Sequence, residues 1–342
     1  MMTGQSTTPR DLGYRWPAEW EPHAATWLGW PHNRDTWPGR SAEAIAEFVE
    51  FAKTLARCEP LHVLAGSGQV MRAAETFLGN REGITLRDIP TNDAWIRDFG
   101  PIFLKKDEQT AIVDWRYNAW GHKYPPFDDD AASTERIGRQ LRLPRFSPPC
   151  VLEGGSVEGN GEGVLMTTRS CLLQRNRNPN FTAEAIEEFL REFFASEQVI
   201  WLDGEIAGDD TDGHIDQLAR FLSPHVVAVA SEANQDDVNF APLVQLRRHL
   251  DNVRVAGRDL EIVEIPLPTP ILQRDQRLPA SYLNFYIANE LVIVPQFWDV
   301  NDRRACDILR EHFPNRDVLG LSCRELVLGL GGFHCLTQQQ PA

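Results

Sequence analysis

The sequence contains no closely spaced cysteine pair and no cysteine–histidine ladder. Its six cysteines are scattered along 342 residues, at positions 58, 150, 171, 306, 323 and 335. This spacing excludes the common zinc modules and a secreted disulfide framework. A chain of this length can bury a large core, so it needs neither a disulfide nor a metal to fold.

Long apolar runs and basic clusters are missing as well. No stretch of 18 apolar residues occurs, and the first 20 residues lack the apolar segment of a signal peptide. We therefore expect a cytoplasmic protein with no membrane partner. The formal charge of −15, from 34 basic and 49 acidic side chains, argues against a nucleic-acid partner. The acidic balance is a weak indication of a positively charged substrate.

What the sequence does contain is a repeated unit of β-hairpin, helix and strand. Copies open near Asp98, Glu153, His214 and Asn284, at a spacing of roughly 60–70 residues. A first copy takes its missing strand from the C-terminal stretch "FHCLTQ". Apolar residues at spacings of three and four predict helices over residues 41–57, 133–143, 182–195, 241–253 and 302–313. Ser41 and Thr182 are expected to cap two of them.

Five such units predict an α/β fold arranged as a ring around an axis, with one open mixed sheet as the alternative. No linker divides the chain, so we expect a single domain over residues 1–342. Each unit has a polar or reactive residue near the start of its first strand, and a ring would bring these positions into one pocket. They are Asp98, Glu153, His214 with Asp216, Asn284 and Cys335.

The acidic stretch "GDDTDGHIDQLARF", residues 208–221, resembles a metal-binding loop. An EF-hand requires Asp at position 1 and Glu at position 12 when Gly213 is at position 6, but Gly208 and Ala219 occupy those positions. The calcium template fails. His214 and Asp216 remain, two apart at the head of a predicted strand and therefore on one face of it. The alternative is a solvated turn with a packed histidine.

The stretch "NDAWIRDFGP", residues 92–101, places a carboxylate beside an aromatic ring. Trp95 and Asp98 together suit a planar cation, which pairs with the acid at its edge and with the ring on its face. The alternative is an ordinary surface ion pair of Arg97. Further along, Glu153 precedes two glycines, which permit a sharp bend or the close approach of a ligand, or form an ordinary tight turn.

Cys335 is the cysteine whose role matters most. If residues 333–337 form a strand, the neighbouring His334 points to the opposite face, so the base must come from elsewhere, and His214 is the best-placed candidate. Cys171, in a strand pattern, and Cys306, in a helix pattern, are interpreted as inert core residues.

Together these stretches resemble the agmatine deiminases, within the wider guanidino-group-modifying superfamily. The matching segments follow one another along nearly the whole chain: "PAEWEPHAATWLGWPHN", "DAWIRDFGP", "EGGS", "DTDGHIDQLARF", "SYLNFYIAN", "VIVPQF" and "HCLTQQQP". One departure is visible. The family commonly has a longer glycine run that ends in Asn two residues before the His-Cys pair, whereas this chain has Leu330 within the run and Gly332 at the Asn position.

The resemblance implies a five-bladed α/β-propeller, or pentein, with pseudo-fivefold hairpin–helix–strand repeats. It also implies a hydrolase of C–N bonds in linear amidines that needs no metal and no cofactor and assembles as a homo-oligomer, commonly a dimer. The implied roles are Cys335 as nucleophile, His214 as general acid and base, Asp98 and Asp216 as guanidinium-binding carboxylates, Glu153 as part of the site motif and Trp95 as pocket lining.

The expected substrate is thus a small cationic guanidino compound. The expected reaction converts agmatine to N-carbamoylputrescine and ammonia, a step towards putrescine, through a thiouronium intermediate on Cys335. Three alternatives remain open at this stage: deimination of free or peptidyl arginine, amidino transfer to an amine, and a non-catalytic polyamine-binding propeller.

Overall fold

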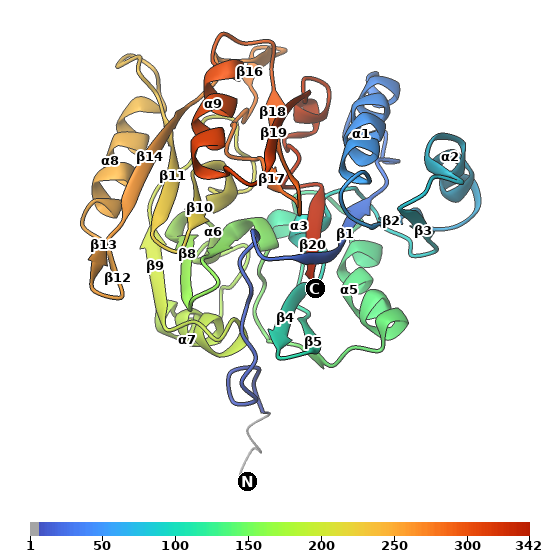
Figure 1. The fold of residues 1–342 in the computed structure, drawn as a ribbon, viewed down its shortest axis with the longest axis horizontal. Helices are drawn as coiled ribbons and strands as arrows, with labels where there is room; N and C mark the ends of the chain where they lie inside the picture. The colour runs from blue at the N-terminus through green and yellow to red at the C-terminus, as the bar shows by residue number, and fades with distance from the viewer. Residues whose placement is uncertain (1–6) are drawn as a thin grey trace.

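Several small β-sheets, rather than one continuous sheet, organise the computed structural model, which describes residues 7–342 (Figure 1). Five sheets have three or four strands each. In chain order they are β20 (Thr337–Pro341), β1 (His23–Gly29), β2 (Leu61–Leu64) and β3 (Ile84–Arg87); β4 (Ile102–Lys106), β5 (Gln109–Val113) and β6 (Arg145–Phe146); β7 (Val157–Gly159), β8 (Val164–Thr168) and β9 (Gln198–Leu202); β10 (Ala219–Ser223), β11 (Val226–Ser231) and β14 (Glu261–Pro266); and β17 (Tyr286–Ile287), β18 (Leu291–Gln296) and β19 (Asp317–Ser322).

The sheets share one pattern of pairing. In each, an antiparallel pair is extended by a parallel strand that follows a helical crossover. The predicted hairpin–helix–strand unit is therefore confirmed, and a single open mixed sheet is excluded for the described residues. Two short ribbons lie outside the pattern, namely β12 (Arg254–Val255) with β13 (Arg258–Asp259) and β15 (Leu272–Gln273) with β16 (Gln276–Arg277).

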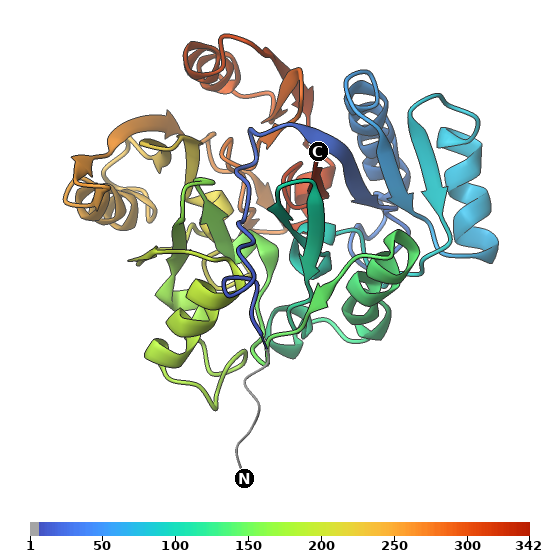
Figure 2. The same ribbon diagram turned by 60° about the horizontal axis from the view of Figure 1, so that its bottom comes forward.

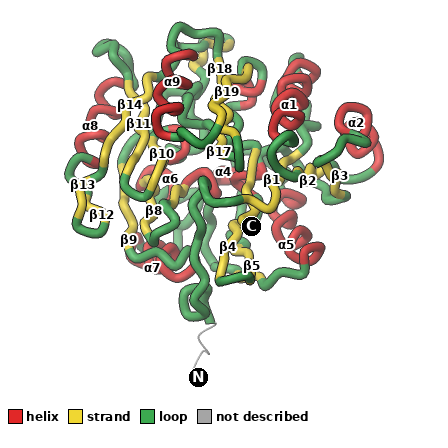
Figure 3. The backbone as a smooth tube through the Cα atoms, in the orientation of Figure 1, coloured by secondary structure: helices red, strands yellow, loops and turns green. Residues whose placement is uncertain are grey.

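The long helices cover the outer sides of the sheets, and the strands lie toward the middle of the molecule (Figures 2 and 3). They are α1 (Ser41–Leu55), α2 (Gly68–Leu78), α5 (Asp128–Leu141), α7 (Ala183–Phe193), α8 (Phe240–Leu250) and α9 (Asp302–His312). Single turns of helix make up the rest: α3 (Ile96–Phe99), α4 (Ala119–His122), α6 (Arg169–Leu172), η1 (Gly154–Ser156), η2 (Ile215–Gln217) and η3 (Leu326–Gly329).

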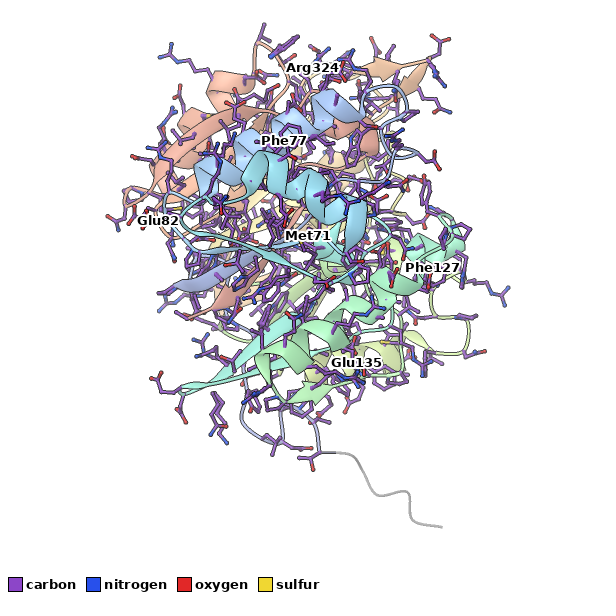
Figure 4. All side chains as sticks on the ribbon, turned by 90° about the vertical axis from the view of Figure 1, so that its right-hand side faces the viewer. Met71, Phe77, Glu82, Phe127, Glu135 and Arg324 are labelled. Carbon is purple, nitrogen blue, oxygen red and sulfur yellow. The ribbon has the colours of Figure 1, made fainter. Side chains whose placement is uncertain are left out.

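All five predicted helices are present, with ends shifted by a few residues. Thr182 caps α7 as predicted, because its side chain accepts the backbone N–H of Ala185. The prediction for Ser41 was wrong: Arg40 precedes α1, and the Ser41 hydroxyl donates to the carbonyl of Trp37. Helix α2 was not predicted, and it presents Phe77, which is 45% exposed, on the face shown in Figure 4.

The two ends of the chain complete one sheet. Strand β20 pairs antiparallel with β1, with Trp27 opposite Gln338, and the Trp27 indole N–H donates to Gln340 Oε1 at 2.9 Å. The C-terminal strand therefore supplies the missing strand of the first unit, as predicted. The tryptophan-rich segment near the N-terminus is packed, since Trp27, Trp30 and Trp37 are at most 1% exposed. No helix within residues 7–342 combines the length and the apolarity that a membrane span requires.

The polar residues lie near the start of the first strand of each unit, as predicted, in the short turn before each hairpin. The prediction that His214 and Asp216 stand on the strand itself was wrong. Asp98 lies in α3, Glu153 directly before η1, and Asp216 within η2. Cys335 lies in a turn before β20. A single turn of helix leaves backbone N–H groups without helical partners, so these turns can offer amides as well as side chains to a neighbour.

Candidate active site

Three of the five turns meet at the Cys335 thiol. The Asn284 amide donates to the sulfur at 3.1 Å and to Asp216 Oδ2 at 3.3 Å, and its Oδ1 accepts the backbone N–H of Cys335 at 3.2 Å. The sulfur itself lies 3.7 Å from Asp216 Oδ2. Asn284 thus fixes the thiol beside a carboxylate. Its position was noted in the sequence, but no role was predicted for it.

The other two turns, which carry Asp98 and Gly155, also lie close to Asp216. A Cβ atom on Gly155 would lie 2.7 Å from Asp98 Oδ1, 2.7 Å from His214 Nδ1 and 3.1 Å from Asp216 Oδ2. Three functional groups therefore converge on Gly155 and leave no room for a larger residue at this position. The backbone N–H of Gly155 donates to Asp98 Oδ1 at 3.0 Å. The convergence of residues far apart in the sequence, predicted from the repeat, is present.

His214 is buried without a hydrogen bond. Its Nδ1 lies 3.6 Å from Asp98 Oδ1 and its Nε2 lies 3.8 Å from Glu153 Oε2, and neither nitrogen has a partner among the described residues. Burial would lower the pKa of His214, but the negative charge of Asp98 and the adjacent Cys171 and Glu153 side chains outweigh it and hold the pKa well above its usual value. The imidazole is thus cationic and free to transfer its proton.

Asp98 is held by an indole. Its Oδ2 accepts the Trp120 Nε1–H at 2.9 Å, and Trp120 stands in the single turn α4, where residues 119–122 all have positive φ. The pKa of Asp98 is raised to about 6, chiefly by burial. The charges of Asp216 and Glu153 contribute to this rise, while His214 and Trp120 oppose it. No role was predicted for Trp120, because a left-handed turn is not expected for Ala-Trp.

Glu153 is fully buried and faces away from Asp98. Its Oε1 accepts Arg177 Nε at 3.0 Å, and its Oε2 lies 3.7 Å from the sulfur of Cys171. Burial raises the pKa of Glu153, but His214 and Arg177 lower it more strongly, so it is ionised. Cys171 is buried in the core as predicted, but it lies in α6 rather than in a strand, beside Glu153.

Cys335 is 7% exposed, and in the free protein its thiol is protonated. Burial, followed by the negative charges of Asp216 and Asp98, raises the pKa of Cys335 well above its usual value. The Asn284 amide opposes the shift by donating to the sulfur. An added cation between the two carboxylates would reverse the unfavourable electrostatics and favour the thiolate.

Residues 15–341 match the family model of the Porphyromonas-type peptidyl-arginine deiminases. The chain belongs to this family. The agmatine deiminase of Pseudomonas aeruginosa (strain LESB58) is 39% identical over 367 residues, covering 100% of this chain and 99% of the relative. Among solved structures, the agmatine deiminase of Enterococcus faecalis is similar with a TM-score of 0.93, 32% identity and 98% of each chain covered. A Cys-to-Ser variant of C. jejuni agmatine deiminase with substrate bound has a TM-score of 0.89, 30% identity and 96% coverage of each chain.

His334 differs from the prediction, although it is not a free base. Residues 333–336 form a turn, not a strand, and the His334 ring lies on the side of Asp216. Its Nδ1 is 2.8 Å from Asp216 Oδ2 and its Nε2 is 2.8 Å from Glu19 Oε2. Both nitrogens are therefore engaged with carboxylates and not with the Cys335 sulfur. Burial, with the nearby cations Arg220 and Arg97, lowers the pKa of His334.

Glu19 lies in the segment "PAEWEP", and no role was predicted for it. Besides His334, it pairs with Arg220 at 3.0 Å and with Arg97 at 3.5 Å and accepts the backbone N–H of Ile287 at 2.9 Å. This buried acid ties the N-terminal segment to three units of the repeat. A surface ion pair of Arg97, left open from the sequence, is excluded because Arg97 is 3% exposed.

The loop before Cys335, which contains the glycine run, is closely packed against its neighbours. A Cβ on Gly332 would lie 2.7 Å from Asn284 Oδ1, so Asn284 occupies the space next to this position. Leu330 has a φ of 72°, a left-handed conformation that glycine adopts more readily. Trp95, 4% exposed, packs against this loop, since a Cβ on Gly331 would lie 2.5 Å from its ring. Trp95 therefore borders the nucleophile loop.

Proposed function

We propose that this protein hydrolyses agmatine to N-carbamoylputrescine and ammonia. The observation that carries the proposal is the convergence of Asp98, His214 and Asp216 next to Gly155, together with the contact between the Asp216 carboxylate and the Cys335 thiol. A thiol, an imidazole and two carboxylates around one point are the groups that hydrolysis of a flat cation requires. The family and the agmatine deiminases among its relatives agree with this chemistry.

Substrate binding begins with the two carboxylates. Among the described residues, the Oδ1 oxygen of Asp216 has no hydrogen-bond partner. Burial raises the pKa of Asp216, but the hydrogen bond and charge of His334 outweigh it and lower the pKa below its usual value, so the carboxylate is ionised. A guanidinium that donates to Asp98 and Asp216 satisfies this oxygen, and its single positive charge offsets part of the buried negative charge. The same cation lowers the pKa of the Cys335 thiol, so the substrate itself assists formation of the thiolate.

Bond making then proceeds through the sulfur. As the substrate binds, the Cys335 thiol loses its proton to solvent. The resulting thiolate adds to the guanidinium carbon, and the His214 imidazolium gives its proton to the departing nitrogen, which leaves as ammonia. A water, deprotonated by the now neutral His214, adds to the thiouronium carbon. The carbon–sulfur bond then breaks, and the electron pair returns to Cys335 with release of the ureido product.

The nearest alternative is deimination of free or peptidyl arginine, which requires a cation for the substrate carboxylate. The buried arginines near the site already have acidic partners. Arg177 pairs with Glu153 and Asp212, and Arg220 pairs with Glu158 at 2.9 Å and with Glu19. Agmatine, which has no carboxylate, needs no such cation. These contacts favour agmatine over arginine.

The test is a substrate panel of agmatine, arginine and an arginyl peptide with ammonia as the readout. We expect kcat/KM to be greatest for agmatine. Absence of ammonia release from agmatine, with release from arginine, contradicts the substrate. Adding amine acceptors and searching for a new guanidino product separates amidino transfer from hydrolysis.

We further propose that the five sheets close around one axis as a five-bladed α/β-propeller that forms a single catalytic domain over residues 1–342, of which 1–6 lie outside the described residues. The repeated pairing pattern and the completion of the first sheet by β20 support this arrangement. A cytoplasmic location and a homodimer remain proposals from the sequence. Light scattering of the purified protein tests the second of these.

A further inference from the structure

One group of possible metal ligands includes the proposed proton donor His214. Among the described residues, Glu153, Cys171 and His214 each offer a donor atom, and these three atoms lie within 4.8 Å of one another. All three side chains are at most 1% exposed. The proposed reaction uses His214, but it has no use for the Cys171 thiol.

The spacing of the donors fits a tetrahedral ion. With Zn–S, Zn–N and Zn–O bonds of about 2.3, 2.05 and 2.1 Å, tetrahedral angles separate sulfur from oxygen by about 3.6 Å and nitrogen from oxygen by about 3.4 Å. The Cys171 sulfur lies 3.7 Å, and His214 Nε2 lies 3.8 Å, from Glu153 Oε2. Side-chain shifts of a few tenths of an ångström would adjust these two spacings.

An independent feature points to a ligand. The His214 nitrogens are fully buried and have no hydrogen-bond partner, whereas buried polar atoms are normally satisfied. An ion on Nε2 would satisfy that atom and leave Nδ1–H directed at Asp98 Oδ1, 3.6 Å away. Arg177 holds the other oxygen of Glu153 at 3.0 Å. A carboxylate behind the histidine and a donor behind the acid are the outer partners that metal ligands usually have.

We propose that Cys171, Glu153 and His214 form a binding site for a thiophilic divalent cation such as Zn²⁺, and that the bound ion inhibits the enzyme by occupying His214. A thiolate, an imidazole and a carboxylate match Zn²⁺ rather than Mg²⁺ or Ca²⁺, which take oxygen ligands. The thiol proton of Cys171 and the Nε2 proton of the His214 imidazolium both leave to solvent as the ion binds. The thiolate and the carboxylate together balance the charge of the ion, which offsets the cost of burying it.

The test measures Zn²⁺ binding by equilibrium dialysis in the full-length Cys335→Ser variant, which lacks the proposed nucleophile. We expect one ion per chain. Adding Cys171→Ala should weaken binding at least about 100-fold, because loss of even an outer partner costs about 10–100-fold. Adding Cys306→Ala, which removes a buried thiol in α9, should leave binding unchanged. Cys171→Ser repeats the test with a side chain of similar size, should Cys171→Ala not fold.

Co²⁺ supplies a spectroscopic readout. A thiolate-to-cobalt charge-transfer band should be present in Cys335→Ser and absent after Cys171 is also replaced. The proposal would be overturned by unchanged Zn²⁺ affinity in both Cys171 variants. It would also be overturned if the wild type bound Zn²⁺ but Cys335→Ser did not, or if neither protein bound it.

Inhibition links the site to the proposed function without depending on it for the binding result. Relative to its own metal-free rate, Cys171→Ala should need at least about tenfold more Zn²⁺ than the wild type for half inhibition of ammonia release. Zn²⁺ binding without any ammonia release from agmatine would refute the proposed function and leave the metal site standing. Ammonia release with equal sensitivity to Zn²⁺ in both proteins would refute the inhibitory site alone.

Discussion

The two buried histidines of the site, His214 and His334, differ in what their ring nitrogens contact. Both nitrogens of His334 lie 2.8 Å from a carboxylate oxygen, one on Asp216 and one on Glu19. Within residues 7–342, neither nitrogen of His214 has a hydrogen-bond partner, although two acids lie within 4 Å. The ring of His334, with both nitrogens engaged, is fixed and supports its neighbours. The ring of His214, with neither nitrogen engaged, can exchange protons with a substrate.

This difference teaches that adjacency in sequence is a poor guide to a catalytic base. His334 is next to Cys335 along the chain but is committed to a structural network of buried charges. His214 is 121 positions from Cys335 in the sequence, yet its ring lies next to Asp98 and Gly155. Substitutions at the two histidines should therefore affect activity and stability in opposite proportions.

The largest effect is expected for His214→Gln. Loss of a positioned proton donor and acceptor should lower kcat for agmatine about 10²–10⁴-fold, with KM changed little because the carboxylates still bind the guanidinium. Steady-state ammonia release measures both constants. A variant that keeps more than about a tenth of the wild-type kcat would assign proton transfer to another group.

Asp216→Asn comes next, because it removes one charged partner of the guanidinium. A hydrogen bond to a charged group contributes about 1.5–3 kcal/mol, so kcat/KM should fall about 10–150-fold. The matched control is Asp203→Asn, which removes an exposed ion pair with Arg169 and should leave kcat/KM unchanged. Equal effects of the two substitutions would show that Asp216 does not contact the substrate.

His334→Gln should reverse the balance between activity and stability. It removes contacts to Asp216 and Glu19, and unpaired buried acceptors cost about 1–3 kcal/mol each, so the free energy of unfolding should drop by at least about that amount. We expect kcat to fall less than about tenfold, because this ring transfers no proton. Urea denaturation of the His334 and His214 variants gives the comparison. A smaller stability loss for His334→Gln than for His214→Gln would contradict the structural role.

The smallest effect concerns pH. Burial raises the pKa of Asp98 to about 6, and only its ionised form attracts a guanidinium, so kcat/KM should rise with pH through about 6 and level off above it. The Trp120 hydrogen bond lowers the pKa of Asp98, so Trp120→Phe should move this rise to higher pH. Profiles of kcat/KM for the two proteins test the direction. A shift to lower pH, or no shift, would separate the rise from Asp98.

The sequence was informative wherever local chemistry decides the structure. Turn residues and alternating apolar positions identified the hairpins, and the C-terminal strand β20 was assigned to the first unit before the pairing with β1 was known. Helix α2 was missed because the repeat calls for one helix between strands, and the first unit has two. His214 and Asp216 were placed on a strand because single helical turns have no periodicity that a sequence can show.

The candidate site was predictable in its members but not in its contacts. Asp98, Glu153, His214, Asp216 and Cys335 occupy equivalent places in the repeat, so a ring-like arrangement predicts that they converge. The supporting contacts depend on tertiary packing between units: Glu19 on His334, Trp120 on Asp98 and Arg177 on Glu153. No spacing in one sequence specifies such pairs, and the same holds for the approach of Cys171 to Glu153.

The most direct test of this account is ammonia release from agmatine by the Cys335→Ala variant, compared with the wild type at equal protein concentration. The wild type should release ammonia, and the variant should show none above background while still folding, because the proposed attacking sulfur has been removed. Release by Cys335→Ala at a rate comparable to that of the wild type would contradict the central claim that this sulfur attacks the substrate.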